Sequence, residues 1–321
     1  MIAPSTMMGQ RSRQIGCCMI FHRAVVSADW AAMPNRGFYL DLAYLERLVR
    51  YVRTCGWDIV SLDEALRRLT EPGHGRFVNI SLDDCYHDTA EFVVPLFQRL
   101  DAPITLFVTT DIPDERLRLR NAGLETILRH SDFIDVDDRR LDLRSSKQKR
   151  AAYADVSSRW ENSGSDEGYL RLCKQVGEDP DRLDDMHRIT WTMLERLRGL
   201  PGVEIGAHTI SHRRISSLDA DAAGTEIGGS RLRLEQRLNI PVRHFAFPYG
   251  QRADCGPRDF AIVRDSGYAT GSTTRKALIR PGANPYALPR HTINGTHRHP
   301  AFAQAHLSGL SALATSVLRR G

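Results

Sequence analysis

Short apolar runs rich in β-branched and aromatic residues recur along the chain and alternate with amphipathic stretches. We expect strands at 17–22, 58–62, 77–83, 104–109, 203–209, 244–250 and 268–273. Apolar residues at helical spacing over 40–56 and 89–100 predict two of the intervening helices, the second of them capped by Asp88. Strands that alternate with helices usually pair in parallel. The pattern therefore favours an α/β fold with a closed or nearly closed barrel, and an open doubly wound sheet is the alternative.

One long interval breaks this alternation. Residues 111–189 are polar, charged and poor in strand signals, which predicts a helical insertion in a single domain spanning 1–321. The basic run 139–150 within it is typical of a solvated helix surface, and the alternative is a lid whose basic side meets an anionic glycan or a lipid phosphate. Residues 297–321 predict a C-terminal helix packed on the barrel, with weak peripheral membrane contact as the alternative.

Composition narrows the class of protein. A hydrophobic share of 41% with 26% charged residues is typical of a soluble globular protein, and no apolar run approaches the roughly 18 residues of a membrane span. The first residues lack the apolar length and cleavage site of a signal peptide, and the six cysteines are scattered, so we expect a cytoplasmic protein with reduced thiols. The net charge of +5 is modest, and without a nucleic-acid motif it predicts no nucleic-acid partner.

Two adjacent carboxylates, Asp83 and Asp84, close one of the expected strands. Consecutive strand side chains face opposite sides, so both can serve one site only where the backbone turns. One could then bind a metal while the other takes a proton. The alternative is a helix cap beside a solvated carboxylate.

Two further polar groups follow expected strands. His208 and His212 stand four residues apart, and a helical turn or a tight loop would point both imidazoles the same way. Two histidines and one carboxylate leave coordination positions open, which suits catalytic zinc or a related divalent ion such as cobalt, nickel or manganese; surface histidines are the alternative. The run "FAFPYG" at 245–250 ends in a sharp turn, fixed by Pro248 and Gly250, that can aim a backbone N–H into a pocket.

The order of these groups, "DD", "HTISH" and "FPYG", resembles the polysaccharide deacetylase family with the NodB homology domain, carbohydrate esterase family 4. The resemblance covers about residues 17–110 and 190–290. It implies a distorted (β/α) barrel of about seven parallel strands. It also implies an enzyme that removes N-acetyl groups from glycans with a divalent metal, for which zinc is the first candidate.

The resemblance also assigns roles to individual residues. It makes Asp83 the general base, and it makes Asp84, His208 and His212 the metal ligands. The backbone N–H of Tyr249 would help to hold the oxyanion. The segment "MIFHRAV" is similar to one in deacetylases with permuted motifs, which makes His22 the candidate general acid.

Several positions depart from the family's pattern. Ala246 stands where an arginine often orients the catalytic aspartate, so we expect Arg290, placed after a late strand, to supply that guanidinium. Cys85 replaces a glycine, so the turn there must accept a side chain, with strain if its φ is positive. A nucleophilic role for Cys85 lacks an orienting third residue. A late LxxH motif is absent, and three histidines compete with His22 for the acid role: His291, His297 and His299.

The resemblance implies a metal-dependent hydrolase that removes N-acetyl groups from a saccharide, and we expect an oligosaccharide or a lipid-linked or lipopolysaccharide-type intermediate. An amide carbonyl is a weak electrophile and its nitrogen leaves only when protonated, so such a site needs a base, oxyanion donors and an acid. The alternatives are a non-glycan C–N amidohydrolase of the same fold and an inactive carbohydrate-binding protein. The pattern leaves the sugar, the aglycone and the oligomeric state open.

Overall fold

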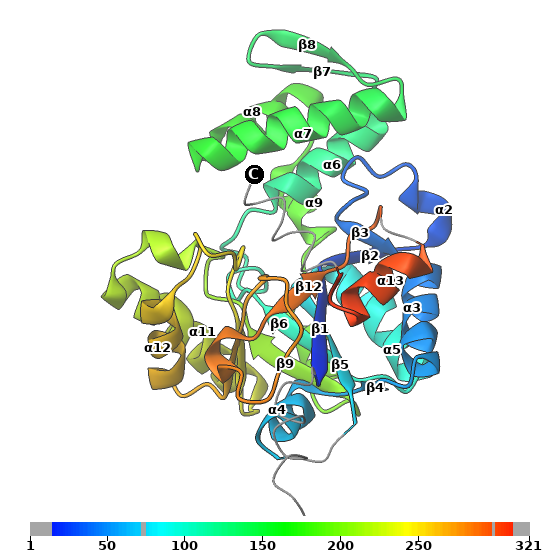
Figure 1. Cartoon of the computed structure of the whole chain (residues 1–321). Helices are drawn as coiled ribbons and strands as arrows, with labels where there is room; N and C mark the ends of the chain where they lie inside the picture. Colours follow the sequence, from blue (N-terminus) through cyan, green and yellow to red (C-terminus); the bar gives the residue numbers. More distant parts are fainter. Residues whose placement is uncertain (1–14, 72–74, 297–298, 311–321) are drawn as a thin grey trace, which may run out of the picture.

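A parallel sheet curled into a nearly closed barrel lies at the centre of the molecule (Figure 1), which we describe from a computed structural model. The structure describes residues 15–71, 75–296 and 299–310. The barrel strands are β1 (Gly16–Phe21), β4 (Asp58–Ile59), β5 (Phe77–Asp84), β6 (Ile104–Val108), β9 (Val203–Ala207), β10 (His244–Ala246), β11 (Thr270–Ser272) and β12 (Arg290–Thr292). Their order is β11-β10-β9-β6-β5-β1-β12, with β4 paired to β5, and these pairs are parallel. The expected barrel is confirmed.

All seven runs that were expected to be strands contribute to this sheet. The run at 58–62 gives the shortest strand, because Ser61 caps the helix α4 (Leu62–Thr70) by accepting a hydrogen bond from the Glu64 amide. The two ends of the sheet approach each other where Ser272, the last residue of β11, bridges in parallel to Leu288, just before β12. This bridge brings the barrel close to closure.

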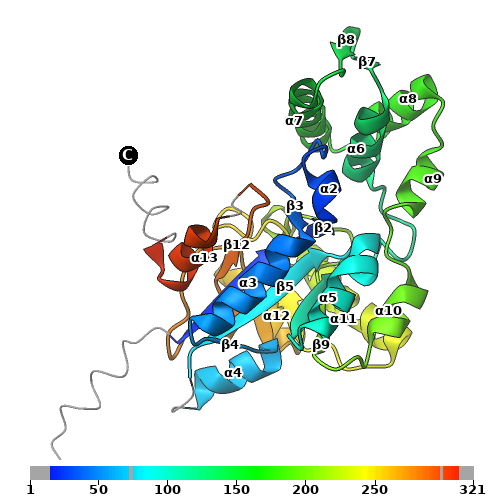
Figure 2. The same ribbon diagram turned by 90° about the vertical axis from the view of Figure 1, so that its right-hand side faces the viewer.

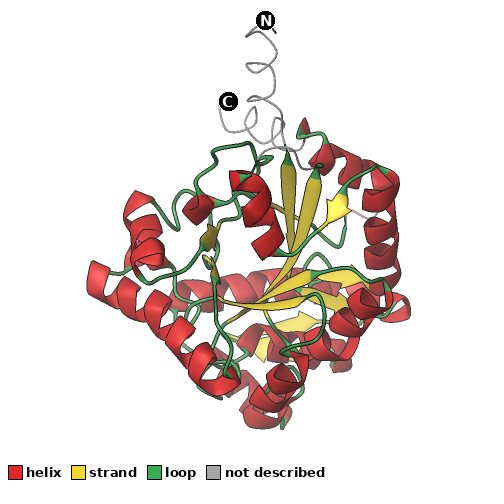
Figure 3. Ribbon diagram, turned by 90° about the horizontal axis from the view of Figure 1, so that it is seen from below, coloured by secondary structure: helices red, strands yellow, loops and turns green. Residues whose placement is uncertain are grey.

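Helices cover the outside of the barrel, and the view from below shows them around the strands (Figures 1, 2 and 3). They include α3 (Leu42–Thr54), α5 (Val94–Arg99), α10 (Trp191–Leu197), α11 (Ala220–Leu238) and α12 (Pro257–Asp265). α3 shows why they form, because Asp41 caps its first turn and its buried residues recur every three or four positions. Its apolar face packs into the main hydrophobic core with the strand side chains.

Asp88 does not cap the helix that follows it, which corrects the sequence-based expectation. The chain passes through a π-helical turn, η1 (Thr89–Val93), and Asp88 makes no capping hydrogen bond there. Its carboxylate accepts instead from Arg23 Nε at 2.9 Å and from the Ala24 amide at 2.8 Å. Arg23 is buried, so the ion pair holds the start of η1 against a short strand, β2 (Arg23–Val25), which pairs with β3 (Tyr39–Asp41).

The insertion stands beyond one end of the barrel (Figures 1 and 2). Its elements are α6 (Arg120–His130), β7 (Phe133–Val136), β8 (Arg139–Asp142), α7 (Ser146–Ser163), α8 (Glu167–Val176) and α9 (Pro180–Asp185). The antiparallel β7–β8 hairpin was not expected, because its charged sequence lacks a strand-like alternation. Leu124, Val156, Tyr169 and Leu183 belong to a hydrophobic cluster separate from that of the barrel, so the insertion has its own small core.

The expected C-terminal helix over 297–321 is described only in part. α13 covers Pro300–Leu307, and its Gln304 accepts a hydrogen bond from the hydroxyl of Tyr51 on α3 at 2.9 Å. Residues 297–298 and 311–321 lie outside the described residues. Within the described part of the chain, every helix is too short or too polar to cross a bilayer.

Acidification should weaken the joint between insertion and barrel through His187. Arg23 can only donate, so it donates to Nδ1 of His187 at 3.2 Å, and Nε2 is left to donate to Thr126 Oγ1 at 2.8 Å. Burial, with the charge of Arg23, lowers the pKa of His187 from 6.5 to about 3. The unfolded chain then binds more protons between these two values. We therefore expect the free energy of unfolding to fall as pH decreases from 6.5 towards 3, by at most about 1.4 kcal/mol per pH unit.

Urea unfolding across this pH range, compared with His187→Gln, measures the effect. Glutamine keeps a polar group at the joint and does not titrate, so its stability should decline less steeply with falling pH. Equal slopes for the two proteins would contradict the assignment.

Candidate active site

The predicted site residues meet inside the barrel and at the carboxyl ends of its strands. Asp83 and Asp84 end β5, His208 follows β9, and Tyr249 follows β10 after a short turn. Parallel strands place all their carboxyl ends at one rim, which is where barrel folds carry reactive groups. Arg290 departs from this pattern: it begins β12 instead of following a strand, and it is level with Cys18, deeper in the barrel.

Asp84, His208 and His212 form a compact cluster. The Oδ1 atom of Asp84 lies 3.4 Å from Nε2 of His208 and 3.2 Å from Nε2 of His212. Ligands about 2.0–2.1 Å from a tetrahedral zinc ion are roughly 3.3 Å apart, so these separations match such a site. Oδ1 of Asp84 is buried and has no hydrogen-bond partner among the described residues, which is costly unless a cation compensates it.

The ring of His208 is oriented for ligation. Its Nδ1 lies 2.8 Å from the carbonyl oxygen of Ala246, which can only accept, so Nδ1 carries the proton and Nε2 keeps a free lone pair. Burial by itself raises the pKa of Asp84, but the imidazoles of His212 and His208 hold that pKa well below its usual value. A carboxylate beside two imidazoles fits a divalent transition metal.

Left-handed backbone conformations aim the side chains of this site. Non-glycine residues with positive φ include Asp84 at 70°, Thr209 at 67°, His212 at 58° and Tyr249 at 61°. Such residues are strained and cluster at functional sites, because the strain is accepted where a side chain must be redirected. The turn at Asp84 is what lets two consecutive carboxylates serve one site.

Cys85, which replaces the usual glycine, also adopts this conformation, with φ of 64°. The turn therefore does accept a side chain at a strained position. Its thiol is fully buried and contacts the Phe107 carbonyl oxygen at 3.5 Å. Burial raises the pKa of the Cys85 thiol well above its usual value, which disfavours the thiolate that a nucleophile requires.

Arg290 holds Asp83 with both branches of its guanidinium. Nη1 donates to Oδ1 and Nη2 to Oδ2, each at 2.7 Å, and both side chains are almost fully buried. Further hydrogen bonds to Ser81 Oγ and to the Thr273 carbonyl oxygen, each at 3.0 Å, fix the arginine. The guanidinium also lies over the ring of Phe107. Asp83 is therefore held in one orientation as a carboxylate.

Tyr249 is an exposed residue whose ring borders the site. No described residue accepts a hydrogen bond from its amide, so that N–H is available to a ligand. The ring packs 5.3 Å from that of His212, and the guanidinium of Arg214 lies 4.9 Å from its centre. This arrangement places the ring of Tyr249 next to His212, one member of the cluster of Asp84, His208 and His212.

His22 lies between β1 and β2 and stacks on Phe38 with ring centres 4.4 Å apart. Burial lowers its pKa, and the charges of Asp84 and Asp83 oppose that shift, so the ring lies within electrostatic reach of both. The competing histidines are elsewhere: His291 binds the Ala277 carbonyl oxygen, and His299 caps α13. His297 lies outside the described residues.

The insertion adds charges that the sequence pattern did not reveal. Burial lowers the pKa of His212, and the carboxylates of Asp84, Asp83 and, from α7, Glu161 raise it. Burial raises the pKa of Tyr249, and the charge of Glu161 adds to that shift. The positive charge of Arg120, at the start of α6, lowers the pKa of Tyr249 slightly against these larger effects. No local motif marks either residue, because both reach the site only through the docking of the insertion.

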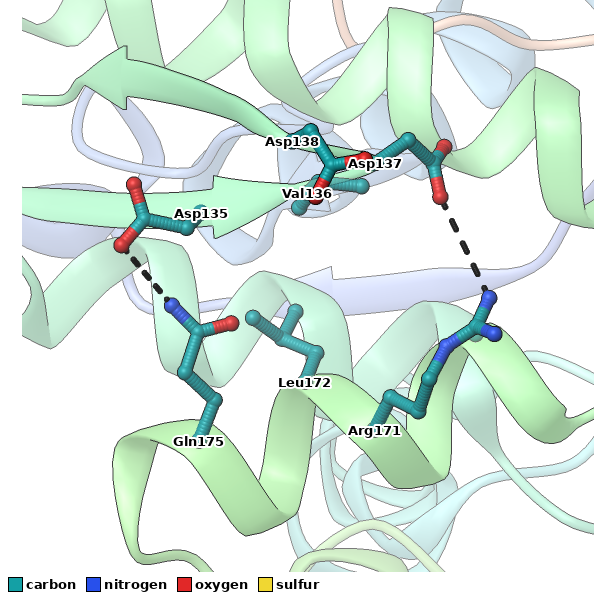
Figure 4. A pocket seen from close by; sticks show the side chains of 8 residues that line it. Asp135, Val136, Asp137, Asp138, Arg171, Leu172 and Gln175 are labelled. Atoms are coloured by element: carbon teal, nitrogen blue, oxygen red, sulfur yellow. Dashed lines mark hydrogen bonds and ion pairs between the residues drawn. The ribbon is translucent and has the colours of Figure 1, made fainter.

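A hollow of about 350 Å³ lies away from this cluster, between the β7–β8 turn and α8 (Figure 4). Its lining includes Asp135 and Asp137, which contact Gln175 and Arg171 across it. None of the predicted site residues lines it. It is therefore a feature of the insertion and no part of the catalytic cluster.

Comparisons with known proteins agree with this architecture. The sequence pattern of the family described as polysaccharide deacetylase matches residues 70–269, more than half of the chain. An uncharacterized protein of Mycobacterium tuberculosis, MT3572, is 34% identical over 164 residues, which are 50% of this chain and 64% of that relative. The chain thus spans less than two thirds of that curated relative.

Two solved structures share the fold. The Streptococcus pyogenes deacetylase PplD, in complex with acetate, aligns with a TM-score of 0.57 at 15% identity and covers 88% of this chain and 93% of its own. IcaB from Ammonifex degensii aligns with a TM-score of 0.56 at 17% identity, and the alignment covers 92% of this chain and 97% of the IcaB chain. At these identities the similarity is one of fold.

Proposed function

This chain belongs to the polysaccharide deacetylase family, and we propose that it is a metal-dependent hydrolase that removes N-acetyl groups from a saccharide. One observation carries the proposal: an unpaired, buried oxygen of Asp84 faces two imidazole nitrogens, next to a second carboxylate that an arginine holds in place. An amide hydrolase needs these two functions, a metal site and an oriented base, side by side.

Asp84, His208 and His212 would hold the metal. We propose zinc, with cobalt, nickel or manganese as alternatives, since one carboxylate and two imidazoles suit these ions and leave positions open. When bound, the ion would supply Lewis-acid polarisation of the acetamide carbonyl and a lowered pKa for a bound water.

Asp83 would act as the general base. The fork of Arg290 occupies one lone pair on each oxygen of Asp83 and leaves others free to accept a proton from the attacking water. The same fork fixes the carboxylate, so little reorientation is needed before proton transfer. Arg290 would thus be a positioning residue that acts through Asp83.

Tyr249 and His22 would complete the reaction. The free amide of Tyr249 would donate to the negative charge that develops on the carbonyl oxygen, a contribution of roughly 3–4 kcal/mol for one donor in comparable sites. His22 would give a proton to the departing amine. Its burial lowers its pKa, which makes its protonated ring a stronger acid.

The saccharide that enters this site would extend beneath the insertion. Glu161 and Arg120 act on Tyr249 from there, so we propose that they select among oligosaccharides and lipid-linked or lipopolysaccharide-type intermediates. We also propose that the protein works in a reducing compartment such as the cytoplasm, which is supported by six cysteines that are all free.

Acetate release tests the proposed activity. The zinc-loaded protein should release acetate from N-acetylglucosamine oligomers, and Asp83→Asn should lower kcat by about 10²–10⁴-fold without removing the metal. Asp101→Asn is a matched control, because Asp101 is exposed with φ of 47° and asparagine tolerates that conformation. Tight glycan binding without turnover, unchanged by Asp83→Asn, would instead identify a binding protein.

His22 can be tested through the leaving group. We expect His22→Ala to lower kcat on N-acetyl substrates by roughly 100-fold, because the amine leaves only when protonated. An aryl acetate, whose phenolate departs unaided, should be hydrolysed at nearly the wild-type rate. Equal losses on both substrates would show that His22 does not serve as the acid.

A further inference from the structure

A second group of potential metal ligands lies at the opposite end of the barrel. Glu204 is near the start of β9, His244 begins β10, and Asp63 lies in the first turn of α4. His208 also follows β9, four residues after Glu204, which corresponds to roughly 13 Å along a strand. The figures place α4 at the end of the barrel away from the insertion (Figures 1 and 2). The two groups are therefore separate.

The imidazole of His244 is buried and its Nε2 points into this group. Only 2% of the residue is exposed, and Nε2 makes no hydrogen bond of good geometry with the described residues. It lies 3.3 Å from Asp63 Oδ1 and 3.9 Å from Glu204 Oε1. Its other nitrogen lies 2.9 Å from Thr270 Oγ1, which can accept the ring proton and leave the Nε2 lone pair free.

The separation between His244 and Asp63 resembles those of the catalytic cluster, where the corresponding distances are 3.2 and 3.4 Å. It matches the roughly 3.3 Å expected between ligands on a tetrahedral zinc ion, whereas the 3.9 Å separation between His244 and Glu204 is longer. Two carboxylates and one neutral imidazole would also balance the charge of a divalent cation. From this geometry we propose that Asp63, Glu204 and His244 bind a zinc ion that is structural instead of catalytic.

The surroundings fit a structural role. Glu204 already accepts hydrogen bonds from the amides of Leu62 and Asp63 at 2.6 and 3.0 Å, so its carboxylate is fixed and caps α4. Oε1 accepts one of these bonds and retains a lone pair for a cation. Arg243 contacts Asp63 at 2.9 Å but is half exposed, so it can turn to solvent when the ion binds. The ion would join α4 to β9 and β10.

Counting bound ions tests this proposal without any activity assay. Protein stripped by a chelator and dialysed against Zn²⁺ should hold two ions per chain, and Asp63→Ala should hold one. Asp63 is half exposed in its side chain, so its replacement should not prevent folding. Asp58→Ala is the matched control, because Asp58 is an exposed aspartate at the same end that pairs with Arg68, and it should retain two ions.

The Asp84→Ala background isolates the second site. Zn²⁺ should raise the melting temperature of Asp84→Ala, and it should leave that of the Asp63→Ala/Asp84→Ala double variant unchanged. The proposal would be overturned if the wild-type protein held one ion per chain, if Asp63→Ala retained that ion and if Asp84→Ala lost it. His244 would then form only a weak ion pair with Asp63. A failure of glycan deacetylation would leave these counts unaffected.

Discussion

Replacing Arg290 with alanine is expected to lower both activity and stability. The substitution leaves Asp83 buried as a carboxylate without its partner, and breaking a buried ion pair from one side typically costs about 3–5 kcal/mol. Asp83 would also lose its fixed orientation, so we expect kcat on N-acetyl substrates to fall by roughly 100-fold or more. Denaturant unfolding and acetate release on the same preparation measure the two effects.

Two further variants separate the effect of orienting Asp83 from the effect of the positive charge of Arg290. Arg290→Lys keeps the positive charge but cannot form the paired hydrogen bonds, so its kcat should lie between those of the wild-type and alanine proteins. Arg50→Ala is the control, since Arg50 makes an exposed pair with Glu46 and should change stability by less than about 1 kcal/mol. Near-normal kcat for Arg290→Ala would show that Asp83 needs no arginine to act.

Removing the carboxylate of Asp84 is expected to have the largest effect on catalysis. Asp84→Ala should bind one zinc ion fewer per chain than the wild-type protein and lose at least about 10³-fold in kcat, because metal polarisation and oxyanion stabilisation disappear together. Ion counting by elemental analysis and acetate release provide the two measurements.

Stability should also fall when metal is absent. The imidazoles of His212 and His208 hold the pKa of Asp84 well below its usual value despite its burial, so the carboxylate stabilises the metal-free protein at neutral pH and its replacement by alanine should lower the free energy of unfolding. With zinc at 100 times its Kd, the wild-type protein should gain about 2.7 kcal/mol from that site, and the variant should not. Wild-type activity and full zinc content in Asp84→Ala would contradict the assigned ligand set.

Local sequence patterns predicted the barrel and the cluster at its rim. Alternating and continuous apolar runs depend on side chains a few residues apart, so the seven strands could be identified. Asp83 and Asp84 are adjacent in the sequence, and His208 and His212 are four positions apart, so both pairs could be recognised as candidate site residues. Parallel strands then required these groups to share a rim.

Other features failed at the sequence level because competing contacts come from distant segments. Asp88 was expected to cap a helix, but its carboxylate binds Arg23, and the β7–β8 hairpin forms from a charged segment supported by the core of the insertion. Arg290 was expected after a strand and instead begins one. A local pattern contains no information about such partners.

The sequence by itself therefore determined seven strands of the barrel and the local ligand pairs at their ends. Only the tertiary structure decided that Arg290 reaches Asp83 from the start of a strand and binds it with both branches of its guanidinium. It also decided that His244 points at Asp63 and Glu204. The physical reason is that the barrel's closure and strand register set these distances. The spacing of apolar residues within a single segment specifies neither the closure of the barrel nor the register of its strands.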